Sequence, residues 1–235
     1  MTTRDLDRYF RGFLDIDGFA SMDASLNGLQ VDNDGAPIRK VAFAVDACLE
    51  TFQRAALCGA GLLFVHHGLF WGKPIALTGV HLPLDQHPEV GNNAGLAELL
   101  GIAEPEPFGD YHGKKIGWKG KLTTPLTVEA AAARIAFQGR PPTAVFPFGP
   151  RESATCAVIS GGAAYEAMQA LDEGVDLYVT GETSHGVYHH ALEGKLNMIA
   201  GGHYATEVWG VRRVMARLAA ETGIETEFID APTGL

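Results

Sequence analysis

The sequence contains two strand–helix–strand patterns, and each ends in polar side chains. In the first, the apolar runs KVAFAVDA (residues 40–47) and GLLFV (61–65) flank a segment with helical spacing that ends at Gly59. In the second, TCAVIS (155–160) and VDLYVTGE (175–182) flank another such segment. Buried parallel strands joined by a helix form a right-handed β-α-β unit. We therefore expect an α/β protein with two pseudo-repeated β-α-β lobes.

The remaining segments suggest how the two lobes are joined. An amphipathic helix is expected at the N-terminus, and a long helix followed by a short strand at the C-terminus. Residues from about 104 to 150 hold most of the 12 prolines, which is typical of short strands and turns. We expect one domain over residues 1–235, with lobe one at about 1–103, a connector at about 104–150 and lobe two at about 151–235.

The amino-acid composition limits the kinds of molecule that the protein can bind and the cellular compartment in which we expect it. The chain has 18 Lys and Arg against 28 Asp and Glu, a net charge of −10. This balance argues against general DNA binding, but it still allows a nucleotide held with the help of metal ions. No apolar run approaches the ~20 residues that span a bilayer, and the N-terminus lacks the pattern of a signal peptide. Three scattered cysteines are typical of reduced thiols, so we expect a cytoplasmic protein.

His66 and His67 stand at the tip of the second strand of the first pattern. Neighbouring side chains on a strand point to opposite faces, so burial of at least one ring is costly unless something satisfies its ring nitrogens. A metal ion would satisfy the ring nitrogens, because neutral imidazole is a common ligand of transition metals. The alternative is that both rings are hydrogen-bonded or solvated.

His203 and Glu207 are four residues apart at the start of the long C-terminal helix, directly after a glycine pair. This spacing places both side chains on one helix face, an arrangement found in metal-binding helices. The alternative is a surface pair without a function. The glycines and the preceding strand favour a position in a ligand-binding cleft.

Asp85 lies in the segment HLPLDQHPEVGNN, between His81 and His87. It could be an ordinary turn residue, and Asn92 and Asn93 are expected to cap the next helix. Three histidines and two carboxylates nevertheless fit a dinuclear hydrolytic site, in which a carboxylate commonly bridges the two ions.

Five segments together resemble the bacterial GTP cyclohydrolase I type 2 family, the YbgI-like proteins with a dinuclear metal centre. These segments are SLNGLQV, VHHGLFW, HLPLDQHPEVGNNAGLAELLGI, VTGETSH and GGHYATEVWG, and they follow the family order over nearly the whole chain. The resemblance places the metal ligands at His66, His67, Asp85, His203 and Glu207. It implies two neighbouring ions in each α/β subunit, and a homohexamer in which a trimer of dimers forms a toroid.

One segment departs from the family pattern. Members usually carry a helix between HHGLFWGKP and IALTGVHLPLD, whereas here Pro74 runs directly into Ile75. Either the protein has a deletion, or the sequence omits a stretch of chain. The second explanation fits better because IALTGVHLPLD resumes as a regular strand, and the stretch would then be a candidate lid beside the metals.

These observations favour a dinuclear metal-dependent hydrolase. Two divalent ions about 3.5–4 Å apart would polarise a carbonyl or C=N bond or clamp a phosphate. The ligands suit Zn, Mn, Fe or Co without choosing among them. The family resemblance implies GTP cyclohydrolase activity, which opens the guanine imidazole ring and releases formate. Candidates for proton transfer, or for support of the ligands, are His81, Glu182 and His185.

Two other functions stay open at this point. The sequence has no P-loop, no GxGxxG motif and no NKxD-type guanine-binding motif, so GTP is implied only by the resemblance. A metal-handling protein for trafficking, storage or sensing, without turnover, would need the same ligands. An interaction scaffold with a structural metal is the third candidate. For the hydrolase we expect a small-molecule substrate, for example a nucleotide, and no membrane partner.

Overall fold

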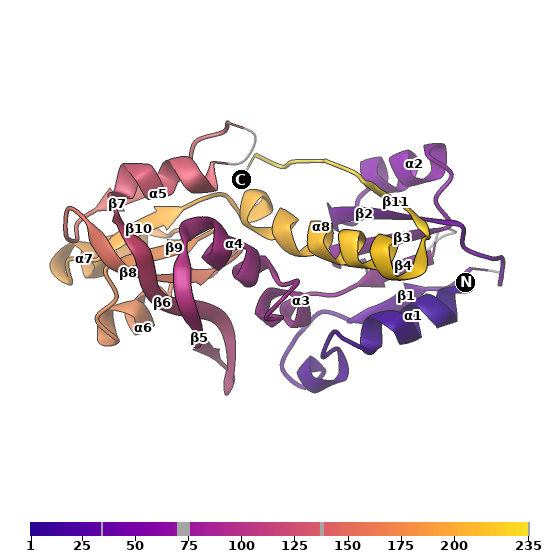
Figure 1. Ribbon diagram of the computed structural model, residues 1–235, viewed down its shortest axis with the longest axis horizontal. Coiled ribbons are helices and arrows are strands. Elements are labelled where there is room, and N and C mark those ends of the chain that lie inside the picture. The colour runs from indigo at the N-terminus through magenta and orange to yellow at the C-terminus, as the bar shows by residue number, and fades with distance from the viewer. Residues whose placement is uncertain (34, 70–75, 137–138, 235) are drawn as a thin grey trace. The chain divides into compact units, whose positions relative to one another are not determined.

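The computed structural model describes residues 1–33, 35–69, 76–136 and 139–234. The chain divides into two compact units, each built on its own β-sheet (Figure 1). Unit 1 comprises Met1–Gly91 and Val208–Ala231, and unit 2 comprises Asn92–Glu207 and Pro232–Leu235. The division falls inside one continuous helix, α8 (His203–Thr222). The junction between Pro74 and Ile75, where a family helix is expected, lies outside the described residues.

Unit 1 contains a five-stranded sheet in the order β1-β4-β3-β2-β11, in which β1 alone is antiparallel to its neighbour. Its strands are β1 (Gly28–Val31), β2 (Lys40–Asp46), β3 (Leu62–His67), β4 (Ala76–Gly79) and β11 (Glu225–Phe228). Its short helices are α1 (Thr3–Arg11), η1 (Asp17–Phe19), α2 (Leu49–Leu57) and α3 (Leu82–Gln86). The unit β2-α2-β3, with parallel strands, is the first predicted pattern.

The core of unit 1 explains why its elements form where they do. Five consecutive residues of β2 and five of β3 are buried, as expected for strands covered on both faces. Helix α1 begins with a capping box between Thr2 and Asp5 and buries Leu6 and Phe10 on one face. The Phe10 ring lies 4.8 Å from the ring of Phe64 in β3. The predicted amphipathic first helix is therefore anchored on the strand that ends in the two histidines.

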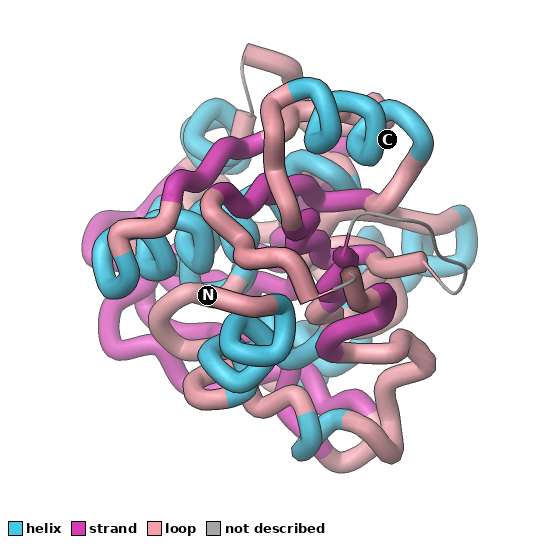
Figure 2. Tube along the Cα trace, turned by 90° about the vertical axis from the view of Figure 1, so that its right-hand side faces the viewer, coloured by secondary structure: helices cyan, strands magenta, loops and turns pink. Residues whose placement is uncertain are grey.

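Unit 2 contains a six-stranded sheet in the order β5-β6-β8-β9-β10-β7, in which the neighbours β8–β9 and β9–β10 pair in parallel and the other neighbours are antiparallel. Its strands are β5 (Ile102–Tyr111), β6 (Lys114–Leu126), β7 (Ala144–Pro147), β8 (Ser153–Ile159), β9 (Leu177–Thr180) and β10 (Asn197–Ala200). Its helices are α4 (Asn92–Leu100), α5 (Val128–Ile135), α6 (Ala167–Asp172) and α7 (His185–Glu193). The unit β8-α6-β9 is the second predicted pattern (Figure 1). Figure 2 shows helices, strands and loops along the trace of the chain.

The segment predicted as a connector, about residues 104–150, forms part of the sheet of unit 2. It supplies most of β5, all of β6 and β7, and α5. Its prolines suggested turns because proline cannot donate to a strand ladder. Here Pro105, Pro107 and Pro147 lie in the edge strands β5 and β7, and Pro125 lies in an irregular stretch of β6. Edge positions and irregularities accommodate proline, so the segment still pairs.

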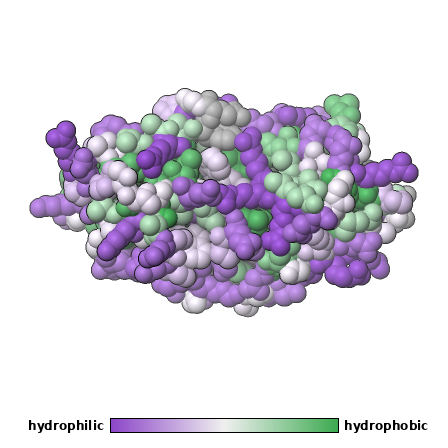
Figure 3. Space-filling model, viewed as in Figure 1, coloured by the Kyte–Doolittle hydropathy of each residue, from purple (hydrophilic) through white to green (hydrophobic). Residues whose placement is uncertain are grey.

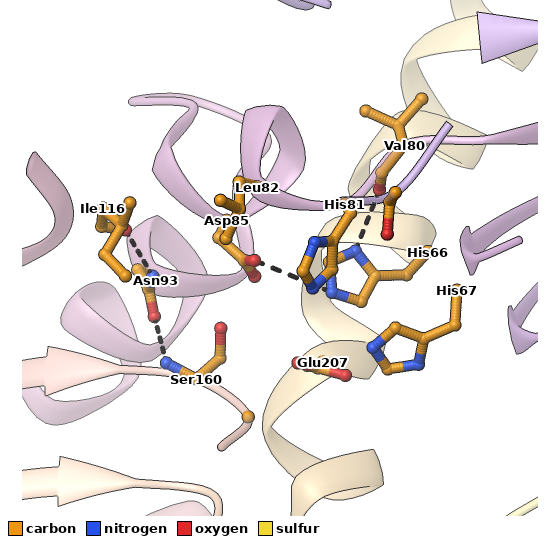
Figure 4. A network of polar contacts seen from close by, with 12 residues as sticks. His66, His67, Val80, His81, Leu82, Asp85, Asn93, Ile116, Ser160 and Glu207 are labelled. Atoms are coloured by element: carbon orange, nitrogen blue, oxygen red, sulfur yellow. Dashed lines mark hydrogen bonds and ion pairs between the residues drawn. The ribbon is translucent and has the colours of Figure 1, made fainter. Parts of the chain in front are cut away.

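Asn93 links elements of unit 2 instead of capping a helix, as the sequence had suggested. Helix α4 already begins at Asn92, and both asparagines are fully buried. The Asn93 Nδ2 donates to the carbonyl of Ile116 at 2.7 Å, and its Oδ1 accepts from the Ser160 backbone N–H at 2.7 Å (Figure 4). One buried side chain therefore satisfies the backbones of β6 and of the loop after β8.

Replacing Asn93 with alanine is expected to lower the free energy of unfolding by about 2–4 kcal/mol, because a buried donor and a buried acceptor lose their partner. Urea unfolding followed by circular dichroism measures the change. Asn33→Ala is the control, since the Asn33 side chain bonds only to neighbours in its own loop among the contacts described. A loss below about 1 kcal/mol for Asn93→Ala would contradict this role.

None of the helices in the described part of the chain is long and apolar enough to cross a membrane. On the face drawn in Figure 3, hydrophilic residues lie between smaller hydrophobic patches.

Candidate metal centre

Three histidines of unit 1 lie together at the carboxyl ends of two neighbouring parallel strands. His66 and His67 end β3, and His81 follows β4 directly before α3. One ring nitrogen from each lies within 4.8 Å of the other two. The ring centroids are 4.5 Å apart for His66 and His67, and 5.1 Å apart for His66 and His81 (Figure 4). The group could therefore hold a metal ion.

Each of these three rings is oriented by an oxygen atom at its Nδ1. The contacts are 2.9 Å from His66 to the Val80 carbonyl, 2.8 Å from His67 to Asp46 Oδ1, and 2.9 Å from His81 to Asp23 Oδ1. A neutral ring that donates through Nδ1 has its lone pair on Nε2. Metal-binding histidines commonly donate their second nitrogen to a carboxylate or carbonyl in this way. All three rings thus direct Nδ1 to an oxygen, an orientation in which Nε2 can bind a metal ion.

Asp85 brings a buried carboxylate to the same group. It lies in the short helix α3, where Leu82 and Leu84 are also buried. Its Oδ2 is 3.7 Å from the Nε2 of His66 (Figure 4). This distance is too long for a hydrogen bond, but two atoms that each bind one ion at about 2.1 Å lie roughly 3–4 Å apart. Asp85 lies in a helix and is therefore not the ordinary turn residue that the sequence also allowed.

The pKa of Asp23 indicates that the carboxylate behind His81 is charged. Burial opposes ionisation, but hydrogen bonds from His81 and Asn27 outweigh it and lower the pKa to about 2. The negative charge faces the Nδ1 side of the ring.

His87, which also brackets Asp85 in the sequence, has a structural role. Its Nε2 donates to the carbonyl of Phe13 at 2.9 Å, and its Nδ1 accepts from the N–H groups of Glu89 and Val90. Burial lowers the pKa of this ring, which favours the neutral form. Both nitrogens are engaged with the backbone, so the ring holds together the turn after α3.

In unit 2, His203 and Glu207 lie one turn apart at the start of α8. The Nε2 of His203 is 3.2 Å from Oε2 of Glu207, whose side chain is 3% exposed. The Nδ1 of His203 contacts Oε1 of Glu182, which follows β9. The contact with Glu207 raises the pKa of His203, whereas burial lowers it. The contact with Glu182 raises the pKa further, and the result is a pKa of about 9. A cation bound by this pair would compete with that proton.

The backbone of Gly161 packs against the side chains of His203 and Glu207. Its carbonyl accepts hydrogen bonds from the N–H groups of Gly181 and Glu182, both at 3.0 Å, and its N–H donates to the hydroxyl of Thr206. Its φ of +66° favours glycine, and a Cβ here would lie 2.3 Å from Oε1 of Glu207. The backbone at this point is packed closely against a carboxylate that is a candidate ligand.

The three residues predicted for proton transfer have different surroundings. His81 belongs to the histidine group, and Glu182 contacts His203. His185 is the exposed first residue of α7, with its ring 6.5 Å from that of His189. Among the described residues it belongs to none of the groups that could hold a metal.

The sequence had not singled out Asp46, Asp23 or Gly161. A signal existed for Asp46, because it ends β2 and lies opposite His67 in the parallel register. A weaker signal existed for Gly161, since a glycine pair follows a buried strand. The sequence carried no signal for Asp23, because this residue lies 58 residues before His81, the ring that it orients.

Comparison with known proteins identifies the family. The model of the DUF34/NIF3 family (NGG1p interacting factor 3) matches residues 1–78 and 72–233. The chain belongs to this family. A Treponema pallidum relative, named GTP cyclohydrolase 1 type 2 homolog, is 40% identical over 286 residues and covers 100% of both chains. A relative from Archaeoglobus fulgidus with the same name is 38% identical over 253 residues, again with full coverage of both. The resemblance seen in the sequence is confirmed.

Solved structures of DUF34/NIF3-like proteins confirm the fold class. The protein ybgI superimposes with a TM-score of 0.89 at 31% identity, and TTHA1606 from Thermus thermophilus with a TM-score of 0.87 at 39% identity. Both comparisons cover 100% of each chain.

The donor set of this DUF34/NIF3 protein fits a divalent transition metal. Imidazole nitrogens and carboxylate oxygens suit Zn, Mn, Fe and Co. None of the three cysteines belongs to a candidate metal-binding group in the described part of the chain. The group in unit 1 is already oriented for binding, because each ring has an oxygen at its Nδ1.

Proposed function

We propose that this DUF34/NIF3 protein is a metal-dependent hydrolase that binds two divalent ions. The proposed ligands are His66, His67, Asp85, His203 and Glu207. The main support is the shared orientation of the three imidazoles in unit 1, together with the buried carboxylate of Asp85. Burial of imidazole nitrogens and a carboxylate without a cation costs free energy, and this arrangement is typical of metal centres.

The five proposed ligands are those that the family resemblance of the sequence implies. His66, His67 and Asp85 belong to unit 1, and His203 and Glu207 belong to unit 2. Glu182 would fix the ring of His203 through its Nδ1 and leave Nε2 as the metal-binding nitrogen.

The proposed substrate is a nucleotide or another small polar molecule, with GTP as the first candidate because relatives are named GTP cyclohydrolase 1 type 2 homolog. Two bound divalent ions would supply Lewis-acid polarisation and would lower the pKa of water towards neutrality. In this reaction water opens the guanine imidazole ring and its C8 carbon leaves as formate. Asp85, Glu207 and the histidines would hold the ions, and the exposed Glu182 carboxylate is a candidate proton carrier.

Reconstitution tests the proposal. Metal-free protein is loaded separately with Zn, Mn, Fe and Co, its metal content is measured by elemental analysis, and formate release from GTP is followed. We expect close to two ions per chain and formate release with at least one metal. His66→Ala should abolish release, whereas His190→Ala, at an exposed position of α7, should not.

Two outcomes would contradict the proposal. One ion or none per chain would contradict the dinuclear centre. Absence of turnover on GTP and on other nucleotides and phosphoesters, combined with transfer of the metal to an apo-acceptor protein, would replace the hydrolase by a metal-handling function.

A further inference from the structure

Two aspartates outside the proposed ligand set touch rings of the histidine group. Asp46 contacts His67, a proposed ligand, and Asp23 contacts His81, whose ring nitrogen lies within 4.8 Å of those of His66 and His67. We propose that Asp46 and Asp23 are positioning residues, which hold His67 and His81 with Nε2 directed at the metal and thereby set the metal affinity. The inference rests on the proposed metal centre and adds the residues that tune it.

Asp46 is placed by the sheet itself. It ends β2 directly opposite His67 in the parallel pairing of β2 with β3. Its Oδ1 lies 2.8 Å from Nδ1 of His67. The backbone around this contact is fixed separately, because the Asp46 carbonyl accepts from the Thr51 hydroxyl and the Ala47 N–H donates to the His67 carbonyl. Changing the carboxylate should therefore leave the strand ends in place.

Asp23 orients His81 from a loop distant in the sequence. Its side chain is 1% exposed, and Oδ1 lies 2.9 Å from Nδ1 of His81. The same carboxylate accepts from the N–H groups of Ser25 and Leu82 and from the side chain of Asn27. Asn27 in turn accepts the backbone N–H of His81 at 2.6 Å. The segment therefore holds both the ring and the main chain of His81.

The three histidines differ in the oxygen that each one contacts. His66 faces the neutral carbonyl of Val80, whereas His67 and His81 face carboxylates. A carboxylate acceptor makes the imidazole a stronger ligand, and removal of such an acceptor typically lowers metal affinity by about 10- to 100-fold. Without the acceptor, the ring can also rotate or change tautomer, so that Nε2 no longer presents its lone pair.

Asp46→Ala and Asp46→Asn test the inference, with zinc affinity measured by chelator competition. We expect the dissociation constant to rise about 10- to 100-fold for Asp46→Ala. The rise should be smaller for Asp46→Asn, because its amide oxygen can still accept from Nδ1–H. Long-range ¹H–¹⁵N spectra of the zinc-loaded protein should assign the Nδ1–H tautomer to His67 in the wild type and show its signals altered in Asp46→Ala.

Asp23→Asn is the less disruptive test at the second position. Asp23→Ala would remove all four contacts of the carboxylate, whereas the amide oxygen of Asn can still accept from two of the four donors. Asp23→Asn should weaken zinc binding and shift the signals of His81. Asp7→Ala is the matched control, because the half-buried Asp7 carboxylate bonds to the Leu29 N–H and to Arg11 and contacts no histidine in the described contacts. It should leave zinc affinity unchanged, whatever its effect on thermal stability.

The inference is overturned if Asp46→Ala binds zinc within twofold of the wild type and the spectrum of His67 is unchanged. It is also overturned if Asp7→Ala loses as much affinity as Asp46→Ala, which would indicate a general effect on folding. Failure of the wild type to bind zinc, or any of the other three metals, would instead overturn the proposed function, and this inference with it.

Discussion

Replacing Glu207 with glutamine is expected to weaken metal binding by at least about 100-fold and to remove one ion or more per chain. The side chain keeps its shape but loses the negative charge, which is the part that a divalent cation binds. Glu207 is almost fully buried beside His203, so water and other carboxylates cannot readily replace it. The loss should exceed the effect of an orienting residue, which is about 10- to 100-fold.

Elemental analysis after dialysis and chelator competition would measure this loss. Glu221→Gln, on the same helix, is the matched control, because the exposed Glu221 carboxylate bonds to Arg217 and Tyr9. That variant should retain all of its metal. A Glu207→Gln protein with wild-type metal content would exclude Glu207 as a ligand.

Replacing Gly161 with alanine is expected to lower metal affinity by about 100-fold while the protein still folds. The left-handed backbone at φ +66° costs an alanine about 1–2 kcal/mol. The new Cβ would overlap Oε1 of Glu207, and the overlap can be relieved only if that flexible carboxylate moves away from its position. The substitution therefore acts on the candidate ligand more than on the fold.

Gly162→Ala provides a control in the neighbouring residue. A Cβ at Gly162 would meet only ordinary contacts at 3.9 Å, with Glu182 and His203. The Gly162→Ala variant should bind metal with an affinity within about threefold of the wild type. Its free energy of unfolding should change by less than about 1 kcal/mol. Equal effects of the two substitutions on metal affinity would show that the close approach of Gly161 to Glu207 does not matter.

Local sequence patterns correctly predicted the elements that present the candidate ligands. Apolar runs predicted β2, β3, β8 and β9, because a strand buried on both faces needs nearly continuous apolar residues. The i, i+4 spacing of His203 and Glu207 likewise predicted their approach, since 3.6 residues per turn bring such side chains onto one face. These predictions depend on interactions over a few residues.

Local patterns failed where a side chain bonds to a distant segment. Asn93 looked like a helix cap, but it bonds to Ile116 and Ser160, which lie far along the chain. The proline-rich segment looked like a connector, but the edge strands of a sheet tolerate proline and the segment pairs there. Neither the partner of a buried amide nor the order of strands in a sheet is encoded by periodicity.

By itself, the sequence determined the α/β class, the two β-α-β patterns and five candidate metal ligands. Only the tertiary structure decided the orientation of the rings. It placed Asp46 opposite His67 through the register of two parallel strands, and Asp23 behind His81 across a long loop. The physical reason is that a ligand's identity is local, whereas its tautomer depends on whichever oxygen the folded chain brings to Nδ1.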